Sequence, residues 1–561
     1  EADCAGTIFA VDLASIVASA GSHPLWAEAL GAGVWQPLGD AITIGTLAQA
    51  KTLCMAPGAS RVATKVRLRC ACTELASITV GDVNVLAEGS TQVAPRTKGL
   101  RHDSGARYHF ALQAGFLDVW EDDGFVGGAW LPAVTAAILP GVNFYAEGAT
   151  LGIAHQNLET IRIRRGDTTH DWVRDLWPYD GIPAVDLGGV YPKTDDVWEV
   201  NFQWTGTPLA YVQFTVNGES TPGLPFLDAL SAPVAIGSAS AAVTAASFKA
   251  ALEALPSLGA TVTVSYVKTT TTSGVATITF GGALSGEEYQ LTAMMTNTAE
   301  VAALASHVQV GKTDFEPLFS ASRGWPGVFG FVQDRLQYGD IPAVPPAIAT
   351  SAAGEYFTLN IEAAGASAAR LDKLRGGNVL ERVLAFAESV YTLVFTDKAV
   401  HFASNRTVSA EEPLNFVRTV SVGTVPNCSP IDLGGRIYYV GRNPKTEPPT
   451  GHQILSLAYS EIDTRFEAVP EHLLATHLVE GIIRSEPQGA NSKADADRAW
   501  FLRDDGRVVV ASVIRSQEVL GFHEWILPPG WLAREISIDA SNDVRLVVEF
   551  NGRLRHHRLD R

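Results

Sequence analysis

Few residues in this sequence have the types and spacing that catalysis or metal binding requires. His472 and His477 are five positions apart, whereas two histidines that bind one zinc ion from a helix are separated by a single helical turn. His556 and His557 are adjacent, so on a strand they point to opposite faces. We therefore expect no histidine-based metal site.

The clustered carboxylates point to turns rather than to a reaction. Glu121–Asp123 and Asp504–Asp505 each stand beside a glycine, which is typical of tight turns. Clustered oxygen ligands would suit calcium, so these two turns are the candidates if a metal binds. The paired carboxylates of a glycoside-cleaving groove are not evident in the sequence. We predict no catalytic residue, no metal and no cofactor.

Other motifs with a chemical meaning are missing or lack the context they need. The sequence has no nucleophile elbow, P-loop or dinucleotide fingerprint. Gly324–Gly330 is rich in glycine, but a strand follows it where a phosphate-binding loop would lead into a helix. We therefore predict that the chain is not an enzyme.

The five cysteines are an odd and scattered set, at positions 4, 54, 70, 72 and 428. A disulfide framework or a zinc site would require even numbers or paired close spacings. Cys70 and Cys72 lie two apart without a second pair. We expect buried, reduced thiols.

Size, charge and hydropathy bound the kind of protein. The chain has 561 residues, 46% of them hydrophobic, which is enough for several cores. No apolar stretch is long enough to cross a bilayer, and the chain begins at Glu1 without a basic and apolar leader, so we expect a soluble protein. The net charge of −18 argues against tight nucleic-acid binding, which needs clustered cations.

Short strands dominate the pattern along the chain. Runs such as Glu159–Ile163 and Val544–Phe550 are rich in β-branched residues, and they end at turn signals such as Asn217-Gly218 and Asp505-Gly506. The 51 glycines and 29 prolines supply further turns. The sequence predicts a mainly β fold of short antiparallel strands.

One segment differs from this pattern. Its residue pattern predicts a strand over Ala210–Asn217 and a helix over Ser240–Leu255. Two further strands are predicted, Thr261–Lys268 and Ala276–Phe280. Within the helix, one face carries Phe248, Leu252 and Leu255. Thr269–Ser273 is expected to be the hairpin loop between the last two strands. We predict a small inserted α+β module.

The run from Arg323 to Asp340 (RGWPGVFGFVQDRLQYGD), followed by Ile341-Pro342 and by Gly354–Phe357 (GEYF), resembles the central signature of tail nozzle proteins of short-tailed bacteriophages, the tail tubular protein B family. Further segments match in order along the chain, from about residue 110 to 530. They are Thr150–Pro183, Tyr391–Phe402, Gly434–Ser460, His472–Glu480 and Trp500–Trp525. The first hundred residues carry little that matches.

The resemblance implies a structural virion protein with a β-propeller-like core. It further implies a homohexameric ring in the viral tail, assembled in the host cytoplasm, that contacts an adaptor or other tail rings and tail fibres. Genomic DNA would be held in its central channel and ejected through it without specific binding. An acidic channel lining would repel phosphate during DNA ejection.

The signature residues are expected to be structural. They are Trp325, Phe331, Gln333, Arg335, Leu336, Tyr338, Tyr356 and Phe357. Phe331–Tyr338 is predicted to be one core strand. Arg335 stands among apolar neighbours and should find a carboxylate or a carbonyl. In the functional alternative, Gln333 and Arg335 contact DNA or a substrate.

These observations divide the chain into five regions. Residues 1–105 are an N-terminal β region of unclear role, and residues 106–208 and 311–530 are two parts of one β-rich core. Residues 209–310 are the inserted platform-like module, and residues 531–561 are C-terminal strands with a basic tail.

Two other functions remain open. One is a hub or distal tail ring of a long-tailed phage. The other is a tail-associated protein that binds glycans or degrades polysaccharides, because β architectures with surface aromatic residues often hold sugars.

Overall fold

The computed structural model describes residues 2–19, 22–55, 61–71, 78–80, 83–87, 93–168, 170–205, 210–225, 238–258, 262–295, 301–374, 380–490, 495–514, 517 and 519–559. Nearly all of its regular structure is β-strand, as predicted. The chain forms two compact units, one of residues 1–183 and 318–561 and the other of residues 184–317. Among the described residues, no helix has the length and apolar character needed to cross a membrane.

The larger unit contains a series of small antiparallel sheets. The first two are β9 (Arg96–Arg101), β10 (Arg107–Gln113), β11 (Phe116–Glu121) and β12 (Gly124–Trp130), then β13 (Asn143–Glu147), β14 (Thr150–His155), β15 (Leu158–Arg165) and β16 (Trp172–Leu176). The next two are β29 (Val328–Val332), β30 (Arg335–Gly339), β31 (Ala347–Thr350) and β32 (Arg370–Lys373), then β33 (Val383–Glu388), β34 (Thr392–Thr396), β35 (Val400–Ala403) and β36 (Phe416–Val420).

The series continues to the end of the chain. Its next strands are β37 (Ile431–Leu433), β38 (Arg436–Arg442), β39 (Gly451–Ser460) and β40 (Arg465–Pro470), then β41 (Ile482–Gln488), β42 (Asp497–Arg503), β43 (Val508–Ile514) and β44 (Val519–Trp525). These two groups are joined by a single pairing, Gly451 with Ile482. The last sheet is β45 (Leu532–Ile538), β46 (Val544–Phe550) and β47 (Arg553–Arg558).

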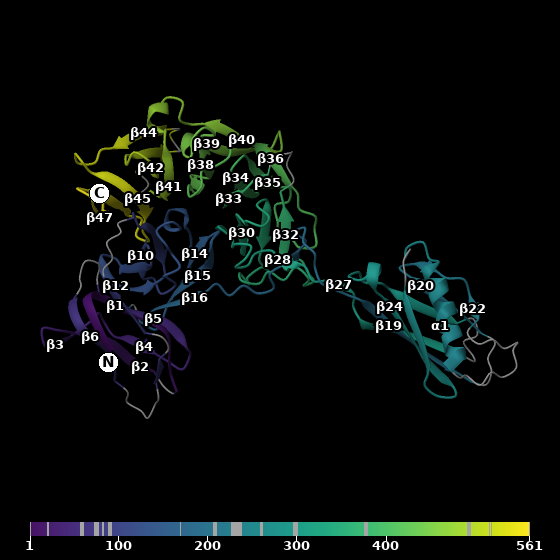
Figure 1. Ribbon diagram of the computed structural model, residues 1–561. Helices are drawn as coiled ribbons and strands as arrows, with labels where there is room; N and C mark the ends of the chain where they lie inside the picture. The colour runs from purple at the N-terminus through teal and green to yellow at the C-terminus, as the bar shows by residue number, and fades with distance from the viewer. Residues whose placement is uncertain are drawn as a thin grey trace. The chain divides into compact units, whose positions relative to one another are not determined.

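The sheets are arranged in a closed ring (Figure 1). The first strand of one sheet contacts the first strand of the next at β9 and β13, β13 and β29, β29 and β33, β37 and β41, and β41 and β45. β36 contacts β40, and the last sheet returns to the first because β45 contacts β9. This β-propeller-like arrangement agrees with the predicted fold class.

Alternating side chains explain why the sheets stack face to face. Trp500 and Leu502 on β42 pack with Ile536 and Leu546 of the last sheet in one buried cluster. Because successive residues of a strand point to opposite faces, a strand that is apolar on both faces can pack against the sheets on each side of it. Hydrophobic burial between sheets therefore holds the ring together.

The N-terminal residues form strands beside the ring. The strands are β1 (Ala2–Ala18), β2 (His23–Gly31), β3 (Val34–Pro37), β4 (Ile42–Ile44), β5 (Gln49–Cys54), β6 (Arg61–Cys70), β7 (Ile78–Val80) and β8 (Val83–Ala87). β5 pairs with β16 through Lys51 and Val173. Cys54 and Cys428 are buried and free, as the cysteine pattern predicted. Cys70 is only partly buried, and Cys72 and the side chain of Cys4 lie outside the described residues.

The segment Phe331–Tyr338 is not a single strand. β29 ends at Val332 and β30 begins at Arg335, with Phe331 paired to Leu336 in a hairpin. Gln333 and Asp334 form the turn, with φ values of +52° and +57°. Two consecutive positive φ values suit the right-handed twist of a two-residue hairpin.

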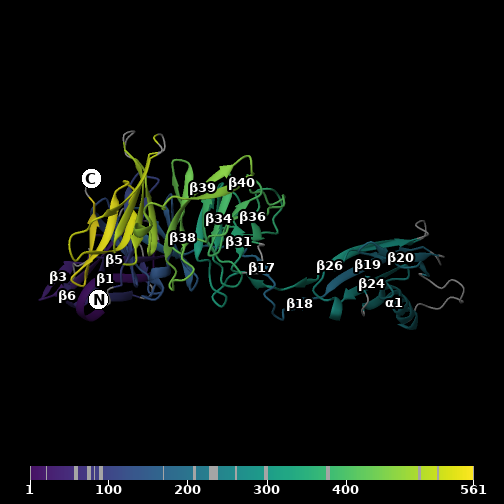
Figure 2. The same ribbon diagram turned by 90° about the horizontal axis from the view of Figure 1, so that it is seen from above.

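The smaller unit contains the predicted α+β module. Its strands are β17 (Ala184–Val185), β18 (Lys193–Thr194), β19 (Asp196–Trp204), β20 (Tyr211–Val216), β21 (Glu219–Ser220), β22 (Leu224–Pro225), β23 (Thr263–Lys268), β24 (Ser273–Phe280), β25 (Leu291–Met295), β26 (Val301–Gln309), β27 (Lys312–Thr313) and β28 (Glu316–Pro317). Figure 2 shows β24, β19 and β26 side by side. The helix α1 (Ser238–Glu253) contacts β23.

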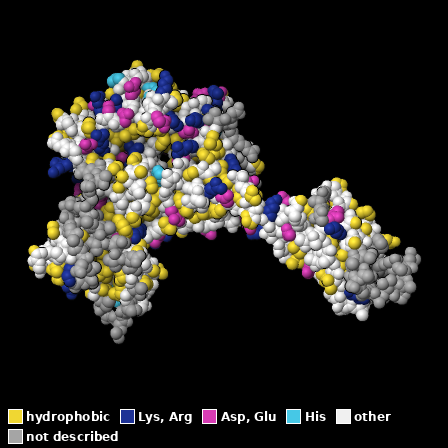
Figure 3. Space-filling model, in the orientation of Figure 1, with side chains coloured by type: hydrophobic (Ala, Val, Ile, Leu, Met, Phe, Trp, Pro, Cys, Tyr) yellow, Lys and Arg dark blue, Asp and Glu magenta, His cyan; other side chains and the backbone are white. Residues whose placement is uncertain are grey.

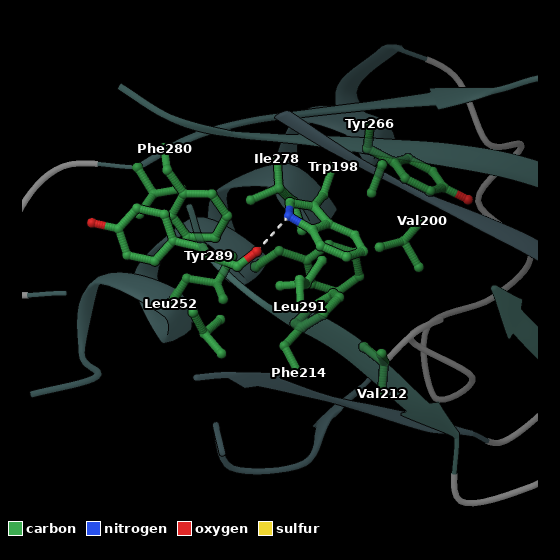
Figure 4. Packing of buried hydrophobic residues seen from close by; sticks show 14 of the residues in the cluster. Trp198, Val200, Val212, Phe214, Leu252, Tyr266, Ile278, Phe280, Tyr289 and Leu291 are labelled. Atoms are coloured by element: carbon green, nitrogen blue, oxygen red, sulfur yellow. Dashed lines mark hydrogen bonds between the residues drawn. The ribbon is translucent and has the colours of Figure 1, made fainter. Parts of the chain in front are cut away.

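The core of this unit confirms the predicted helix face. Phe248 and Leu252 of α1 belong to one buried cluster together with side chains of β19 and β20. Leu255 is in the same cluster but follows the end of the helix at Glu253, two residues before the predicted end. Figure 4 shows this packing, with the indole Nε1 of Trp198 donating to the carbonyl of Tyr289 at 3.0 Å. The loop predicted at Thr269–Ser273 is the turn between β23 and β24. The unit begins at residue 184, before the position 209 inferred from the sequence.

A buried carboxyl group in the larger unit gives a testable pH dependence. Burial raises the pKa of Asp118 to about 7, so the folded chain keeps a proton that the unfolded chain loses near 3.8. The free energy of unfolding should therefore fall as the pH rises from about 4 to about 7, by up to about 4 kcal/mol from this group. Above about pH 7, the contribution of Asp118 to the free energy of unfolding does not change further.

Asp118→Asn should remove this contribution. In urea unfolding, the variant should gain stability relative to the unmodified chain as the pH rises from 4 to 8. The exposed Glu362 provides a control, since Glu362→Gln should leave the pH dependence as it was. A constant difference between Asp118→Asn and the unmodified chain over this range would contradict the assignment.

Candidate functional site

Charged side chains from three strands, each the first strand of its sheet, come together inside the ring. β9 contributes Arg96 and Lys98, β41 contributes Arg484 and Glu486, and β45 contributes Glu535. The two residues on β9 are two positions apart, as are the two on β41, so each pair lies on one side of its strand. We call these five residues the axial cluster.

Glu535 is the centre of the axial cluster. Its Oε1 accepts from Arg96 Nε at 2.9 Å and its Oε2 from Arg484 Nε at 3.3 Å. The side chain of Glu535 is only 3% exposed. A buried charge needs a partner of opposite sign, and the two guanidinium groups supply that partner to the Glu535 side chain.

The arginines are themselves held by backbone carbonyls of the turn that leads into β13. Arg96 Nη1 donates to the carbonyls of Pro140 and Val142, at 3.2 and 2.6 Å, and Arg484 Nη2 donates to the carbonyl of Pro140 at 3.2 Å. These carbonyls lie just before β13. The axial cluster therefore joins the first, second, sixth and seventh sheets of the series, including the pair that closes the ring.

Glu486 has a different environment from Glu535. Burial raises the pKa of Glu486, and the nearby carboxylate of Glu535 adds to the rise, while Lys98, Arg96 and Arg484 oppose it. Within the described part of the chain, the Glu486 carboxyl forms no ion pair or side-chain hydrogen bond. The raised pKa of Glu486 favours its protonated form, beside the carboxylate of Glu535 that two arginines contact.

A carboxyl group with a raised pKa beside an ion-paired carboxylate is an arrangement that can perform acid catalysis. The protonated one can donate to a leaving oxygen, and the ionised one can stabilise positive charge. Cys428 is not an alternative nucleophile, because burial raises the pKa of its thiol to about 12 and the thiolate is the reactive form.

A second charged network links four sheets of the ring. Asp340 accepts from Arg382 Nε and Nη2, both at 2.9 Å, and from Gln156 Nε2 at 2.8 Å. The backbone N–H of Arg382 donates to Asp397, which also lies 3.5 Å from Arg442 Nη1. Figure 3 shows Lys, Arg, Asp and Glu side chains interspersed over the ring, with a small opening near its middle. Every acid here has a basic partner, so we assign this network to holding the sheets together.

The signature residues of the sequence do not belong to the axial cluster. Tyr338 is buried, with its hydroxyl donating to the carbonyl of Tyr356 at 2.6 Å and accepting from Trp177 at 3.1 Å. Trp325 stacks on Tyr179, and Phe357 packs edge-on against Trp177. These residues form an aromatic core.

Arg335 finds the carbonyl partners predicted for it. Its guanidinium donates to the carbonyls of Ser351, Ala366 and Ala368, at 2.7–2.9 Å. It is 3% exposed and Leu336 is fully buried. Gln333 accepts from the backbone N–H of Val408 at 2.8 Å. Both polar groups are used within the fold.

The acidic turns considered as metal sites bind arginines instead. Asp123 pairs with Arg545 and Arg558, at 2.9 and 2.5 Å, and Asp505 pairs with Arg503 at 2.9 Å. In the described ranges no three His, Cys, Asp or Glu side chains are grouped to hold a metal ion. Arg558 belongs to β47, so the basic C-terminal segment is part of a sheet.

Sequence reasoning missed the axial cluster. Its two carboxylates lie on β41 and β45, and no local motif connects them. The available signal was the pairing of charges at alternate positions, Arg484 with Glu486 and Arg96 with Lys98, in strands that should otherwise be apolar.

Comparison with known proteins identifies structures of similar fold but no family. No protein-family model and no curated protein sequence matches the chain. Among solved structures, a leech intramolecular trans-sialidase is 10% identical with a TM-score of 0.29, over 99% of this chain and 94% of that one. The NanB sialidase from Streptococcus pneumoniae is 8% identical with a TM-score of 0.27, over 96% and 91%.

These neighbours correct two predictions made from the sequence. They are sialidases, so the assignment to phage tail nozzle proteins, with its tail ring and DNA ejection, was wrong. The prediction that the chain is not an enzyme is overturned by the same finding, because these neighbours are enzymes. At such low identity the likeness concerns the fold alone, and no substrate or site is carried over from it.

Proposed function

We propose that the larger unit cleaves glycosidic bonds in a glycan, with Glu486 as the general acid and Glu535 as the charge-stabilising carboxylate. The observation that carries this proposal is the contrast between the two groups. Burial favours the protonated form of Glu486, while Glu535 is bound by two guanidinium groups. That division of roles is what acid-catalysed glycoside cleavage requires.

The reaction consumes one water molecule. Glu486 gives its proton to the glycosidic oxygen as the bond to the anomeric carbon breaks. Glu535 stabilises the positive charge that develops on the sugar ring. The oxygen of water then bonds to the anomeric carbon, and its proton returns to Glu486, which restores the starting state.

Lys98 of the axial cluster favours an acidic sugar. Lys98 is partly exposed, and among the described residues no side-chain hydrogen bond or ion pair occupies its ammonium group. A cation in this position can pair with a substrate carboxylate. We therefore assign the substrate class as glycans that contain carboxylated sugars.

A panel of oligosaccharides tests the proposal. The full chain is incubated with sialosides, oligogalacturonates and neutral oligosaccharides in isotopically labelled water, and the products are analysed by mass spectrometry. We expect the chain to cleave an acidic oligosaccharide and to place one labelled oxygen in the product. Glu486→Gln should lose this cleavage, whereas the exposed control Glu362→Gln should retain it. The proposal would be ruled out if both variants cleaved equally well, or if the unmodified chain cleaved no oligosaccharide of the panel.

A further inference from the structure

Two partly exposed tyrosines and an exposed arginine lie close together away from the axial cluster. Tyr391 precedes β34, Tyr459 lies on β39 and Arg406 follows β35. The tyrosine rings are 5.1 Å apart between centroids, at 47° to each other. The hydroxyl of Tyr459 donates to that of Tyr391 at 3.4 Å, and the guanidinium carbon of Arg406 lies 5.6 Å from the Tyr391 ring centroid.

A buried aromatic layer fixes the positions of the two rings. Tyr391 packs edge-on against Phe402 at 5.7 Å, and Tyr459 against Phe466 at 5.1 Å. Phe466 is 2% exposed. Because the rings are anchored from below, a ligand that stacks on them would not have to order them first.

Arg406 lacks the acidic partner that most arginines of this chain have. No carboxylate of the described residues forms an ion pair with it, although the charge of Glu461 acts on it from further away. Tyr459 and Arg406 together lower the pKa of the Tyr391 hydroxyl. An exposed guanidinium with free donors is suited to a ligand carboxylate.

We propose that Tyr391, Tyr459 and Arg406 form a second binding subsite, for a carboxylated sugar residue of a glycan. The C–H groups on one face of a pyranose carry partial positive charge and pack on the negative face of an aromatic ring. The two hydroxyls can exchange hydrogen bonds with the sugar, and Arg406 binds its carboxylate. The subsite rests on the proposed function in taking a glycan as its ligand, and it holds a sugar other than the one that is cleaved.

Calorimetric titration with galacturonate hexasaccharide and its methyl ester tests the subsite. The full chain carrying Glu486→Gln serves as background, so that the ligand is not consumed. Tyr391→Ala with Tyr459→Ala should weaken binding at least about tenfold, a loss of about 1.4 kcal/mol, whereas the two Phe replacements, which keep the rings, should weaken it less. Arg406→Met should weaken binding of the acid but not of the ester.

Tyr211→Ala is the matched control, because Tyr211 is 47% exposed and lies in the smaller unit. Thermal melting confirms that each variant is folded. Unchanged binding in the double Ala variant overturns the subsite. So does a lack of binding by the chain that carries only Glu486→Gln. Cleavage by the unmodified chain together with unchanged binding overturns the subsite alone. Loss of binding in the double Ala variant, with no cleavage by the unmodified chain, supports the subsite and overturns the proposed function.

Discussion

Replacing Glu486 by glutamine is expected to lower the rate of cleavage of an acidic oligosaccharide by about 10²–10⁴-fold, the usual contribution of a general acid. Glutamine keeps the shape of the side chain but has no acidic proton for the leaving oxygen. Binding of the oligosaccharide should change little. The rates and the affinity are measured separately, by product analysis and by calorimetry.

The leaving group provides a control for this replacement. An aryl glycoside whose phenol is strongly acidic needs no protonation as its bond breaks. The Glu486→Gln variant should therefore cleave such a glycoside nearly as fast as the unmodified chain. A rate loss of the same size for both substrates would show that Glu486 supports the fold rather than the proton transfer.

Replacing Glu535 by glutamine is expected to destabilise the ring by about 3–5 kcal/mol, because it leaves the buried guanidinium groups of Arg96 and Arg484 without their countercharge. The side chains of the arginines are 9% and 13% exposed, so solvent would screen them poorly. Since β45 and β9 close the ring, the loss should appear in the urea unfolding of the larger unit, followed by tryptophan fluorescence.

The same sheet offers an exposed pair for comparison. Glu549 accepts from Arg534 at 2.8 Å, with about a third of each side chain exposed. Glu549→Gln should cost no more than about 1 kcal/mol. If the two glutamine variants unfolded at the same urea concentration, the axial cluster would have no special part in closing the ring.

The sequence was sufficient for the elements whose pattern is local. The α+β module follows from the spacing of Phe248, Leu252 and Leu255, since helix geometry places them on one face. The partners of Arg335 follow from the cost of burying a charge. The hairpin at Gln333 and Asp334 was missed because neither residue is the glycine that usually marks positive φ.

The axial cluster depends on tertiary structure. Glu486 and Glu535 meet because β41 contacts β45 in the folded chain, a contact that no local pattern records. The match to tail nozzle proteins rested on residues such as Trp325 and Tyr338, which the structure places in an aromatic core. Aromatic strands and Gly-Asp turns are needed by many packed β-sheets, so their order along the chain did not specify a function.

The pH dependence of kcat/KM for an acidic oligosaccharide tests whether Glu486 is the general acid. Because Glu486 acts in its protonated form, the rate should fall as the pH rises through its raised pKa. Glu486→Gln should remove this basic limb, whereas Glu362→Gln should retain it. We expect a basic limb that depends on Glu486; a profile of the same shape in Glu486→Gln would rule out proton transfer from this residue.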